Sequence, residues 1–515
     1  MKALKIVGYT MAVIQLMITI ALIYLVMTSR LIPILYGIIG GTILVAIPLG
    51  LLIMVKKGSK KLTITAIIIA LVLSAILGAA CYFVGVANKA IDNVTGNTTE
   101  TDEINVYVGS DDAVTSVNEA VANGYLFGIV NTVDANSIQE TLNEINSEVN
   151  DEIKTEGYDS IYAAIGAFEN GRINGIIANK GTIVTLDSSE EYPQYSTQNQ
   201  KRIIAKEHEE EMAEPEAEID TDRFCMYISG IDTFGSVTAK SRSDVNIIAV
   251  VNNKTKTVLL VSTPRDYYLK LAGINKEDKL THAGLYGIDT SMNTLKTIYD
   301  VDLTCYVRIN FSGFQTIIDK LGGIDVDSQY SFTSITEEGT YSFSEGKNHL
   351  NGAEALGFAR SRNFVDGDRQ RGRNQMQVIK ATIEKLESSN MLKNYSGLMD
   401  ELGNMCQTNM KKEDVGYLVQ STLENGNWKV LTYSVSGSDS EKVCYSLGTP
   451  AYVMIPNKGD LEYGNQLISR VLGDEEVKQE EIDKYIVSKD NEDLITEEKP
   501  TEDKDKDKKE KTTER

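Results

Sequence analysis

The sequence predicts an α/β protein with three N-terminal transmembrane helices, a small accessory α/β domain and a larger α/β/α sandwich. Three long apolar runs lie within residues 1–87, which hold seven of the 51 basic residues and none of the 73 acidic ones. The rest of the 515-residue chain therefore has a net charge of −29, and it mixes strand-like and helix-like segments. This acidity disfavours nucleic acid as a partner. Three histidines and five cysteines exclude a Cys-rich zinc module or a scaffold held by many disulfides.

The apolar runs are each long enough to cross a membrane. They are Ile6–Met27, Leu31–Val55 and Leu62–Ala87. A cleaved signal peptide would have one shorter run. Lys2 and Lys5 precede the first run, and four lysines between residues 56 and 61 separate the second from the third. The positive-inside rule then places these lysines in the cytoplasm and everything after the third span on the extracytoplasmic face.

Four parts are expected along the chain. They are a membrane anchor at 1–90, an accessory α/β domain with an acidic linker at 91–215, a larger domain at 216–475 and a disordered charged tail at 476–515. The linkers are predicted at residues 88–101, which are rich in Asn, Thr and Gly, and at the polar and acidic residues 188–222. The tail consists almost entirely of Lys, Glu, Asp and Thr and cannot bury a core.

The accessory domain is expected to contain strands and helices in mixed order. The predicted strands are Ile104–Val108, Ile173–Ala178 and Thr182–Leu186, and the predicted helices are Ile138–Val149 and Ile161–Phe168. Histidines, cysteines and paired carboxylates do not cluster in these residues, so the sequence predicts no chemistry here.

The larger domain shows more predicted elements. Its expected strands are Phe224–Ser229, Val245–Val251, Thr257–Ser262, Val307–Ile309, Gly323–Val326 and Gly357–Ser361, and its expected helices are Thr290–Tyr299, Phe311–Leu321, Ala353–Leu356 and Asn374–Ser389. Mixed strands and helices over some 250 residues are typical of an α/β/α sandwich.

Arginines cluster in one part of this domain. Five of the 14 fall within Arg360–Arg373. Arg360 and Arg362 would point to one face of a predicted strand, and Arg369, Arg371 and Arg373 would follow in a loop that leads into a helix. Guanidinium groups bind phosphate oxygens in bidentate fashion, and a helix N-terminus favours anions. The alternative is a solvated basic face paired with neighbouring acids.

Two aspartates and two further arginines lie at predicted strand ends. Asp232 and Asp244 flank one loop, Arg242 lies in the same loop, and Arg265 follows the next strand. Two carboxylates beside several arginines form a plausible Mg²⁺–pyrophosphate site, because the metal bridges phosphate oxygens and guanidinium groups neutralise the rest. Either aspartate alone could instead cap a turn.

Nine segments between residues 223 and 375 resemble, in order, the motifs of the LytR–CpsA–Psr family. The three-span anchor and extra domain resemble its capsule-associated CpsA branch. The segments are Gly230-Ile231-Asp232, Ser241-Arg242-Ser243-Asp244, Thr263-Pro264-Arg265-Asp266, Lys279-Leu280-Thr281-His282-Ala283, Asn310-Phe311-Ser312-Gly313-Phe314, Leu321-Gly322-Gly323-Ile324-Asp325-Val326, Leu350-Asn351-Gly352-Ala353-Glu354-Ala355-Leu356, Ala359-Arg360-Ser361-Arg362 and Asp368 to Gln375.

The resemblance implies an Mg²⁺-dependent phosphotransferase in the cell membrane of a Gram-positive bacterium. Its members transfer a glycopolymer, either capsular polysaccharide or teichoic acid, from a polyprenyl-pyrophosphate carrier to peptidoglycan. The implied metal-side carboxylates are Asp232 and Asp244; the implied pyrophosphate ligands are Arg242, Arg265, Arg360, Arg362, Arg371 and Gln375; and the implied catalytic residues are Asp244, Arg242 and Arg265. Many members carry Arg where this chain has Asn374, so either Arg369 or Arg373 could face the site.

Several alternatives remain open at this point. The same site could bind or hydrolyse polyprenyl pyrophosphate, and a membrane regulator is a third reading. The nucleophile could be an acceptor sugar hydroxyl with Asp244 as its base, although a carboxylate that holds Mg²⁺ is a poor base. Helix Phe311–Leu321 could line an apolar groove for the polyprenyl tail or belong to ordinary core. His282 and His349 are expected to be structural.

The cysteines give one further expectation. Four of them follow the predicted spans, where no cytosolic thiol pool keeps them reduced. We expect Cys225–Cys305 and Cys406–Cys444 disulfides; the alternative is four unpaired buried thiols.

Overall fold

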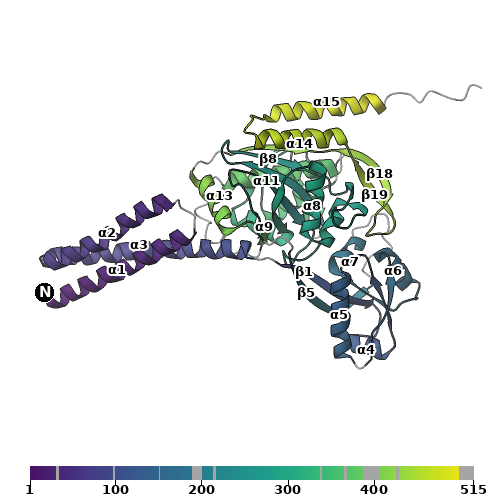
Figure 1. Ribbon diagram of the computed structural model, residues 1–515, viewed down its shortest axis with the longest axis horizontal. Helices are drawn as coiled ribbons and strands as arrows, with labels where there is room; N and C mark the ends of the chain where they lie inside the picture. The colour runs from purple at the N-terminus through teal and green to yellow at the C-terminus, as the bar shows by residue number, and fades with distance from the viewer. Residues whose placement is uncertain are drawn as a thin grey trace, which may run out of the picture.

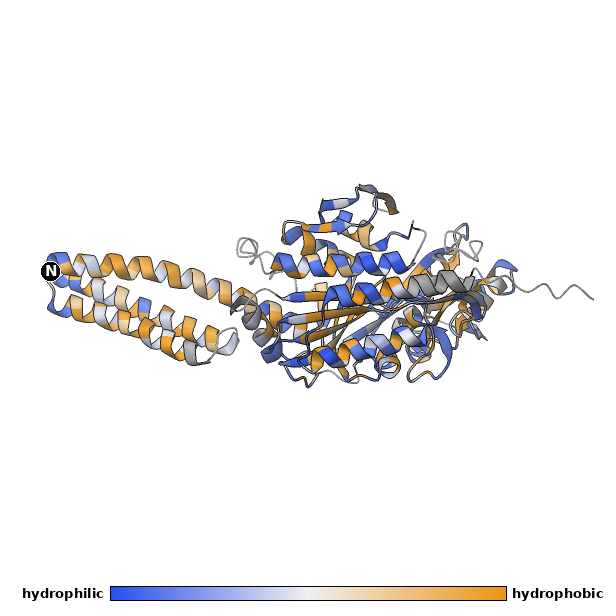
Figure 2. Ribbon diagram, turned by 90° about the horizontal axis from the view of Figure 1, so that it is seen from above, coloured by the Kyte–Doolittle hydropathy of each residue, from blue (hydrophilic) through white to orange (hydrophobic). Residues whose placement is uncertain are grey.

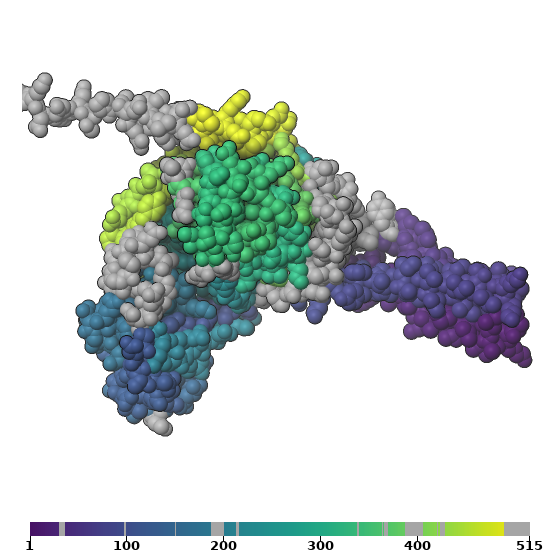
Figure 3. Space-filling model, turned by 180° about the vertical axis from the view of Figure 1, so that it is seen from behind, coloured from purple at the N-terminus to yellow at the C-terminus, as the bar shows by residue number. Residues whose placement is uncertain are grey.

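The computed structural model has a bundle of long helices, a central main domain and a smaller accessory domain (Figure 1). It describes residues 1–29, 34–96, 99–149, 151–187, 200–212, 216–336, 339–362, 364, 368–386, 405–424 and 428–497. The bundle and the accessory domain project from the main domain in different directions, as the views from front and back agree (Figures 1 and 3).

The bundle confirms the three predicted apolar helices. They are α1 (Lys2–Ser29), α2 (Ile34–Lys57) and α3 (Lys60–Thr95), and each is long and apolar enough to cross a membrane. Their mostly apolar surface is visible in Figure 2. The linker predicted at 88–101 is wrong where the structure describes it, because α3 continues to Thr95 and a strand begins at Thr99. Buried Ala90 and Ile91 extend the packed face of α3, and Asn88 donates a hydrogen bond to the Leu25 carbonyl, 3.2 Å away.

The accessory domain (residues 99–212) is built on a five-stranded sheet of order β3-β2-β4-β1-β5. Its elements are β1 (Thr99–Gly109), α4 (Val117–Ala122), β2 (Leu126–Val130), α5 (Ala135–Glu148), β3 (Lys154–Tyr158), α6 (Ile161–Glu169), β4 (Gly175–Asn179), α7 (Lys180–Asp187) and β5 (Gln200–Glu211). Strands β3, β2 and β4 are parallel to one another, and β1 is antiparallel to β4 and β5. Helices α4 and α5 pack on one face of the sheet, and α6 and α7 pack on the other.

Two predictions for this region are wrong. The expected strand Thr182–Leu186 is helix α7, whose Ile183 and Leu186 are buried at a helical spacing of three. The predicted linker 188–222 contains β5, which pairs with β1 along its whole length. Strand β5 lies at the edge of the sheet, where Arg202, Glu207 and Glu209–Glu211 are exposed to water while Ile203 and Ile204 pack on the core.

The main domain (residues 216–497) is a three-layer α/β/α sandwich, as the sequence predicts. Its sheet has the order β16-β11-β6-β7-β8-β17. The strands are β6 (Arg223–Ile231), β7 (Ser243–Asn252), β8 (Thr257–Ser262), β11 (Leu303–Asn310), β16 (Cys406–Thr408) and β17 (Lys429–Ser434). The pairs β11–β6 and β17–β8 are parallel, and the other neighbours are antiparallel.

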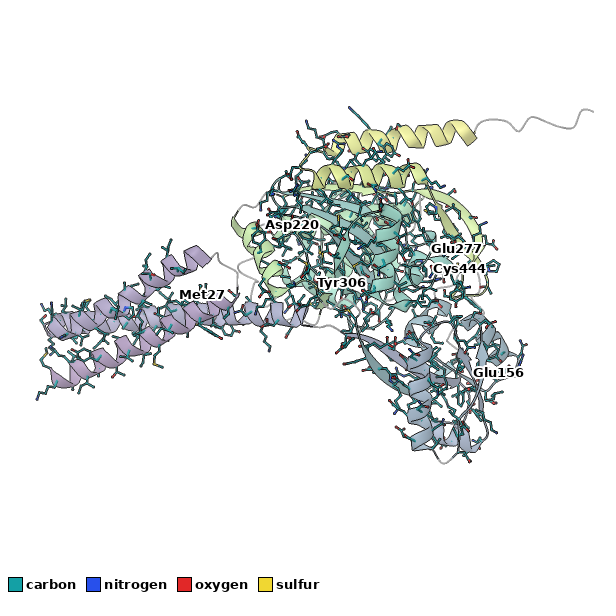
Figure 4. All side chains as sticks on the ribbon, in the orientation of Figure 1. Met27, Glu156, Asp220, Glu277, Tyr306 and Cys444 are labelled. Carbon is teal, nitrogen blue, oxygen red and sulfur yellow. The ribbon has the colours of Figure 1, made fainter. Side chains whose placement is uncertain are left out.

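Helices cover both faces of this sheet. One layer holds α8 (Ile288–Tyr299) and α14 (Lys458–Leu472), and the other holds α9 (Phe311–Lys320), α10 (Gly352–Arg360), α11 (Asp368–Leu386) and α13 (Lys412–Glu424). Smaller elements connect them, namely β9 (Tyr268–Lys270), β10 (Glu277–Lys279), the 3₁₀ helix η3 (Leu280–Tyr286), β12 (Ile324–Ser328), β13 (Phe332–Thr336), β14 (Gly339–Phe343), β15 (Gly346–Leu350), β18 (Gly437–Val443) and β19 (Pro450–Pro456). Tyr306 of β11 marks the interior of the sandwich (Figure 4).

Three expectations about this domain need correction. The expected strand Gly357–Ser361 is the end of helix α10, which begins with a capping box between Asn351 and Glu354. Helix α11 begins at Asp368, so the predicted loop with three arginines is helical. The predicted disordered tail contains α15 (Gln479–Glu497), because Ile482 is fully buried in the core; residues 498–515 lie outside the described residues.

All five cysteines are free, so both predicted disulfides are wrong. Cys225 and Cys305 are neighbours on β6 and β11, where the Cys305 thiol donates a hydrogen bond to the Cys225 carbonyl at 3.5 Å. Cys406 lies on β16, whereas Cys444 packs against the accessory domain. Burial raises the pKa of the Cys225, Cys406 and Cys444 thiols to about 12, so these groups behave as small apolar side chains.

Candidate functional site

A cavity of about 970 Å³ lies between the sheet of the main domain and the helix layer of α9, α10, α11 and α13. All eight predicted site residues line it, although nothing in this placement tests their roles. They are Asp232, Arg242, Asp244, Arg265, Arg360, Arg362, Arg371 and Gln375. The described lining contains no other charged side chain, so five arginines face two aspartates there.

The topology explains why these side chains meet. Asp232 follows the carboxyl end of β6, Asp244 opens the antiparallel strand β7, and Arg265 follows the carboxyl end of β8. These three positions therefore share one edge of the sheet. From the helix layer, Arg360 ends α10, while Arg371 and Gln375 lie four residues apart on one face of α11. Arg360 and Arg362 share the cavity, but not through the strand that the sequence predicted.

Ion pairs hold both carboxylates in place. Arg265 Nη1 lies 2.8 Å from each oxygen of Asp244, and the Thr281 hydroxyl donates to the same carboxylate at 3.2 Å. Burial alone would raise the pKa of Asp244, but the charges of Arg265, Arg242 and Arg371 outweigh it and hold this pKa below its ordinary value. Asp244 is therefore ionised at neutral pH.

The second carboxylate has a similar environment. Arg242 pairs with Asp232, and Arg360 Nη2 lies 3.8 Å from Asp232 Oδ1. The Arg360 guanidinium also lies over the Phe311 ring, 4.3 Å from its centroid. The sequence reasoning missed Thr281 and Phe311 as site residues, although both lie in segments that carry the family resemblance.

The structure also answers which arginine of α11 faces the cavity. Of the described arginines on this helix, Arg371 alone lines it. Arg369 donates to the Gly437 carbonyl, and Arg373 Nε donates to Gln370 Oε1 at 2.8 Å. Asn374 donates to the Phe358 carbonyl at 3.2 Å, so it anchors α11 on α10. The lining therefore contains Arg371, which the sequence prediction named, and neither Arg369 nor Arg373, the two alternatives for a further arginine.

The remainder of the cavity is apolar. Its lining includes Ile228, Ile231, Val245, Val307, Ile309, Phe314, Ile317, Val378, Ile379, Ile383, Leu386, Leu418 and Val419. Helix α9 thus lines the cavity in addition to contributing Ile318 to the core. Ser334, Ile335 and Thr336 of β13 also line it, and Ile335 remains 76% exposed.

The described lining offers a metal ion two carboxylate ligands, Asp232 and Asp244. Among the described residues, His, Cys, Asp and Glu form no group of three or more that could hold an ion. Mg²⁺ commonly uses one or two carboxylates and completes its shell with phosphate oxygens and water. Asp232 and Asp244 therefore fit a magnesium ion that arrives with a phosphate ligand.

Neither described histidine of the main domain belongs to the cavity lining. His282 is buried, with Nδ1 2.6 Å from Asp278 Oδ1 and 2.9 Å from the Ser446 hydroxyl. His349 pairs with Asp325 on the surface. The structural roles expected from the sequence stay predictions for both histidines.

Comparisons with known proteins place this geometry in context. The model of the LytR_cpsA_psr family matches residues 189–458. The polyisoprenyl-teichoic acid–peptidoglycan teichoic acid transferase TagU of Bacillus licheniformis is 32% identical over 222 residues, which are 43% of this chain and 70% of that protein. The corresponding transferase TagT of Bacillus subtilis is 31% identical over 201 residues, which are 38% of this chain and 62% of that protein.

Two solved structures are also similar to part of this chain. A crystal structure of B. subtilis TagV is 27% identical and covers 50% of this chain and 100% of its own, with a TM-score of 0.43. A structure of TagT bound to LIIa-WTA is 27% identical and covers 50% of this chain and 94% of its own, with a TM-score of 0.40. The chain spans between 57% and 70% of the lengths of the curated relatives it matches. Because the family model matches more than half of its residues, the chain belongs to the LytR–CpsA–Psr family.

Proposed function

We propose that the protein is a membrane-anchored phosphotransferase that moves a glycopolymer from a polyprenyl-pyrophosphate carrier to peptidoglycan. The observation that carries this proposal is the cavity, which joins a cluster of arginines to a long apolar region. A polyprenyl pyrophosphate matches both regions, because it joins a charged pyrophosphate head group to an apolar chain. The names of the related teichoic acid transferases support the same reaction class.

The charged end of the cavity suits a pyrophosphate. The positive charges in its lining exceed the negative ones by three, so an anion with several charges would balance them. Guanidinium groups bind phosphate oxygens through paired, charge-assisted hydrogen bonds. Arg242, Arg265, Arg360, Arg362 and Arg371 would bind the two phosphates, and Gln375 would contact the same head group.

Magnesium is part of the proposal. Asp232 and Asp244 would hold the ion together with oxygens of the bound pyrophosphate. The ion would supply neutralisation of the phosphate charge when bound. We expect EDTA to lower the transfer rate strongly and added Mg²⁺ to restore it, as measured by product formation. An undiminished rate in EDTA would remove the metal from the proposal.

The proposed reaction is a substitution at the phosphorus next to the saccharide. The oxygen of an acceptor hydroxyl forms a new P–O bond as the P–O bond to the polyprenyl phosphate breaks. The arginines stabilise the charge on the departing polyprenyl phosphate, which matters more for this chemistry than a strong base. Because its pKa is lowered, Asp244 is a weak proton acceptor, and we assign the hydroxyl proton to the departing polyprenyl phosphate, a phosphate monoester with a second pKa of about 6.

The membrane anchor fits a lipid-linked substrate. The lysines around the first three helices favour an extracytoplasmic main domain, where peptidoglycan lies. The apolar part of the cavity would take part of the polyprenyl chain. The polymer would be a teichoic acid by the names of the relatives, or a capsular polysaccharide by the resemblance to the CpsA branch.

Reconstitution tests the proposal. The full chain in lipid nanodiscs is incubated with a polyprenyl-pyrophosphate-linked disaccharide, peptidoglycan fragments and Mg²⁺. We expect disaccharide phosphate joined to peptidoglycan and one polyprenyl phosphate released per transfer, detected by mass spectrometry. Arg470→Ala, which removes a surface ion pair on α14, serves as the matched arginine control. Free disaccharide phosphate without conjugate would establish hydrolysis instead, and an unconsumed lipid would contradict both reactions.

A further inference from the structure

The loop between β6 and β7, residues 232–242, begins with Asp232 and ends with Arg242, and is called the site loop here. Its two ends are tied together, because the Asp232 amide donates to the Arg242 carbonyl at 3.0 Å. The middle of the loop faces the accessory domain instead of the cavity. Three consecutive residues of β1 contact the site loop. Thr101 and Asp102 contact it directly, and Glu100 contacts it through Arg308.

The first contact is made by backbone. The Thr101 amide donates to the Thr238 carbonyl at 2.9 Å, and the Lys240 amide donates to the Thr101 carbonyl at 3.0 Å. The hydroxyls of Thr101 and Thr238 lie 2.7 Å apart. Strand β1 thereby forms a parallel bridge with the site loop at Ala239.

The second contact passes through a buried ion pair. Glu100 pairs with Arg308 of β11, and the Arg308 side chain is 2% exposed. Arg308 Nη1 lies 3.5 Å from the Val237 carbonyl and 3.4 Å from the Thr238 carbonyl. Glu100 also accepts a hydrogen bond from the Ile288 amide at 3.0 Å. The strand and the site loop are thus linked through one guanidinium.

The third contact is a buried cluster around Lys240. Its ammonium lies 3.0 Å from Asp102, 3.6 Å from Asp134 and 2.8 Å from Glu210. Asp102 also accepts hydrogen bonds from Ser137 at 2.6 Å and from Asn179 at 3.1 Å. The site loop therefore places its lysine among three carboxylates of the accessory domain.

Two glycines approach the backbone of the site loop closely. A Cβ atom at Gly181 of α7 would lie 2.8 Å from the Lys240 carbonyl oxygen, and one at Gly284 of η3 would lie 2.3 Å from the Ser241 carbonyl oxygen. These residues come from the accessory domain and the main domain respectively. A side chain larger than glycine at either position would push against the loop backbone at residue 240 or 241.

The accessory domain is itself fixed on the main domain. Ile161, Ile183 and Leu186 form one buried apolar cluster with Cys444, Leu447 and Val453 of the β18–β19 region. Cys444 and Glu277 mark this boundary in Figure 4. A buried apolar contact of this kind resists relative motion of two domains. Strand β1 can therefore act as a fixed support.

We propose that the accessory domain is a positioning element for the site loop, with Lys240 as its main positioning residue. The cluster around Lys240 holds residues 238–242 in place, and through them it sets where Arg242 and Asp232 meet the substrate. Its effect on catalysis rests on the proposed phosphotransfer. Strand β1 also follows α3 directly along the chain, so the support is connected to the membrane anchor.

The test combines exchange and kinetics on the full chain in nanodiscs. For Lys240→Met we expect backbone hydrogen exchange in residues 232–242 to accelerate about tenfold or more. We also expect kcat for the lipid-linked disaccharide to fall about tenfold or more, since small misplacements of reacting groups have large kinetic effects. Affinity for polyprenyl pyrophosphate should change less than about threefold, because Arg265, Arg360 and Arg371 remain.

Two further variants complete the design. Lys206→Met removes the same charge from β5, where the lysine pairs with Glu144 and Glu148 inside the accessory domain, and it should change none of the three quantities. Gly181→Ala disturbs the loop backbone without removing a charge, and it decides the question if Lys240→Met does not fold. It should accelerate exchange in the site loop and lower kcat.

The outcomes separate this inference from the proposed function. Unchanged exchange in a folded Lys240→Met protein would overturn the inference, whatever the activity. A parallel loss of kcat and lipid affinity would overturn it as well, because the cluster would then only hold the fold. A wild-type protein that transfers nothing would instead contradict the proposed function, and the exchange measurement would still decide the role of Lys240.

Discussion

Two buried arginine–carboxylate pairs belong to different regions of the molecule and have different surroundings. Arg265 and Asp244 line the cavity, whereas Arg308 and Glu100 lie in the contact between the main and accessory domains. Arg265 and Arg308 are similarly buried, at 9% and 2% exposure of their side chains. Burial and pairing alone therefore do not distinguish a site for a ligand from a structural contact.

The difference lies in the space beside each pair. In the proposed function, a phosphate enters the cavity and shares the guanidinium of Arg265 with Asp244. Arg308 is not among the described lining residues of the cavity. Its other hydrogen bonds go to the Val237 and Thr238 carbonyls of the site loop. We therefore expect the first pair to contribute mainly to binding and transfer, and the second mainly to stability.

The largest effect is expected at the enclosed pair. Arg308→Ala leaves Glu100 buried without its guanidinium, which costs about 3–5 kcal/mol of folding free energy. Thermal unfolding of the full chain, followed by intrinsic fluorescence, measures the loss. The fraction that remains folded should keep its affinity for polyprenyl pyrophosphate. A folded variant that has lost this affinity would erase the distinction between the two pairs.

The pair in the cavity should show the opposite profile. Arg265→Ala removes a charge-assisted contact to phosphate, worth about 1.5–3 kcal/mol, so transfer should slow by about 10- to 150-fold. Affinity for polyprenyl pyrophosphate should fall as well, as measured with a fluorescent lipid. Arg470→Ala is again the control, because its arginine lies on the surface of α14. Unchanged transfer would remove Arg265 from the site.

Sequence reasoning was most successful where chemistry is concentrated along the chain. The eight predicted site residues lie in short segments with characteristic composition, and the structure brings all of them to one cavity. Apolar runs likewise predicted the three long helices. The helices follow from local pattern, and the set of site residues follows from arginine and aspartate patterns together with the resemblance to the LytR–CpsA–Psr family; neither needs knowledge of distant contacts.

The failures have other causes. Residues 357–361 look like a strand but belong to a helix whose start is fixed by a capping box six residues earlier. The acidic residues of β5 look like a linker, yet they pair with β1, about 100 residues away along the chain. The pairing of Glu100 with Arg308 spans 208 positions, so no local pattern reveals it. Tertiary contacts decided the last two cases, whereas the capping box is a local helix-start signal that the sequence prediction did not use.

A third comparison, with a smaller expected effect, is between an isoleucine that lines the cavity and one that packs in the hydrophobic core. Ile383 of α11 lines the cavity, whereas Ile298 of α8 packs against the core on the other face of the sheet. Ile383→Trp should weaken binding of a long polyprenyl pyrophosphate about tenfold, since displacing about two methylene groups from apolar contact costs ~1.5 kcal/mol. Ile298→Trp should lower stability by about 1–3 kcal/mol through overpacking but spare lipid affinity. Equal losses of affinity in both variants would argue against a lipid in the cavity.

The smallest effect concerns two aspartates whose pKa values shift in opposite directions. The pKa of Asp244 is lowered, so its contribution to stability is present above its unfolded pKa and lost as the pH falls through the folded one. Burial and the nearby Asp102 carboxylate raise the pKa of Asp134 well above its ordinary value, against the opposing charge of Lys240. For Asp134 the stabilising contribution is present below the unfolded pKa of about 3.9 and is lost as the pH rises through the folded pKa.

In the wild type, ionisation of Asp134 lowers the free energy of unfolding as the pH rises. Asp134→Asn should therefore remove this loss. Asn also tolerates the left-handed backbone of this position, where φ is 52°. We expect the variant to gain no more than about 1 kcal/mol over the wild type, with the gain larger at pH 8 than at pH 4.5. Asp300→Asn, at an exposed position with φ of 49°, controls for the effect of an Asp→Asn change on a left-handed backbone. Thermal unfolding at the two pH values measures the difference. A variant that loses stability as the pH rises would mean that Asp134 stays ionised beside Lys240, and that the cluster stabilises the site loop with its full charge.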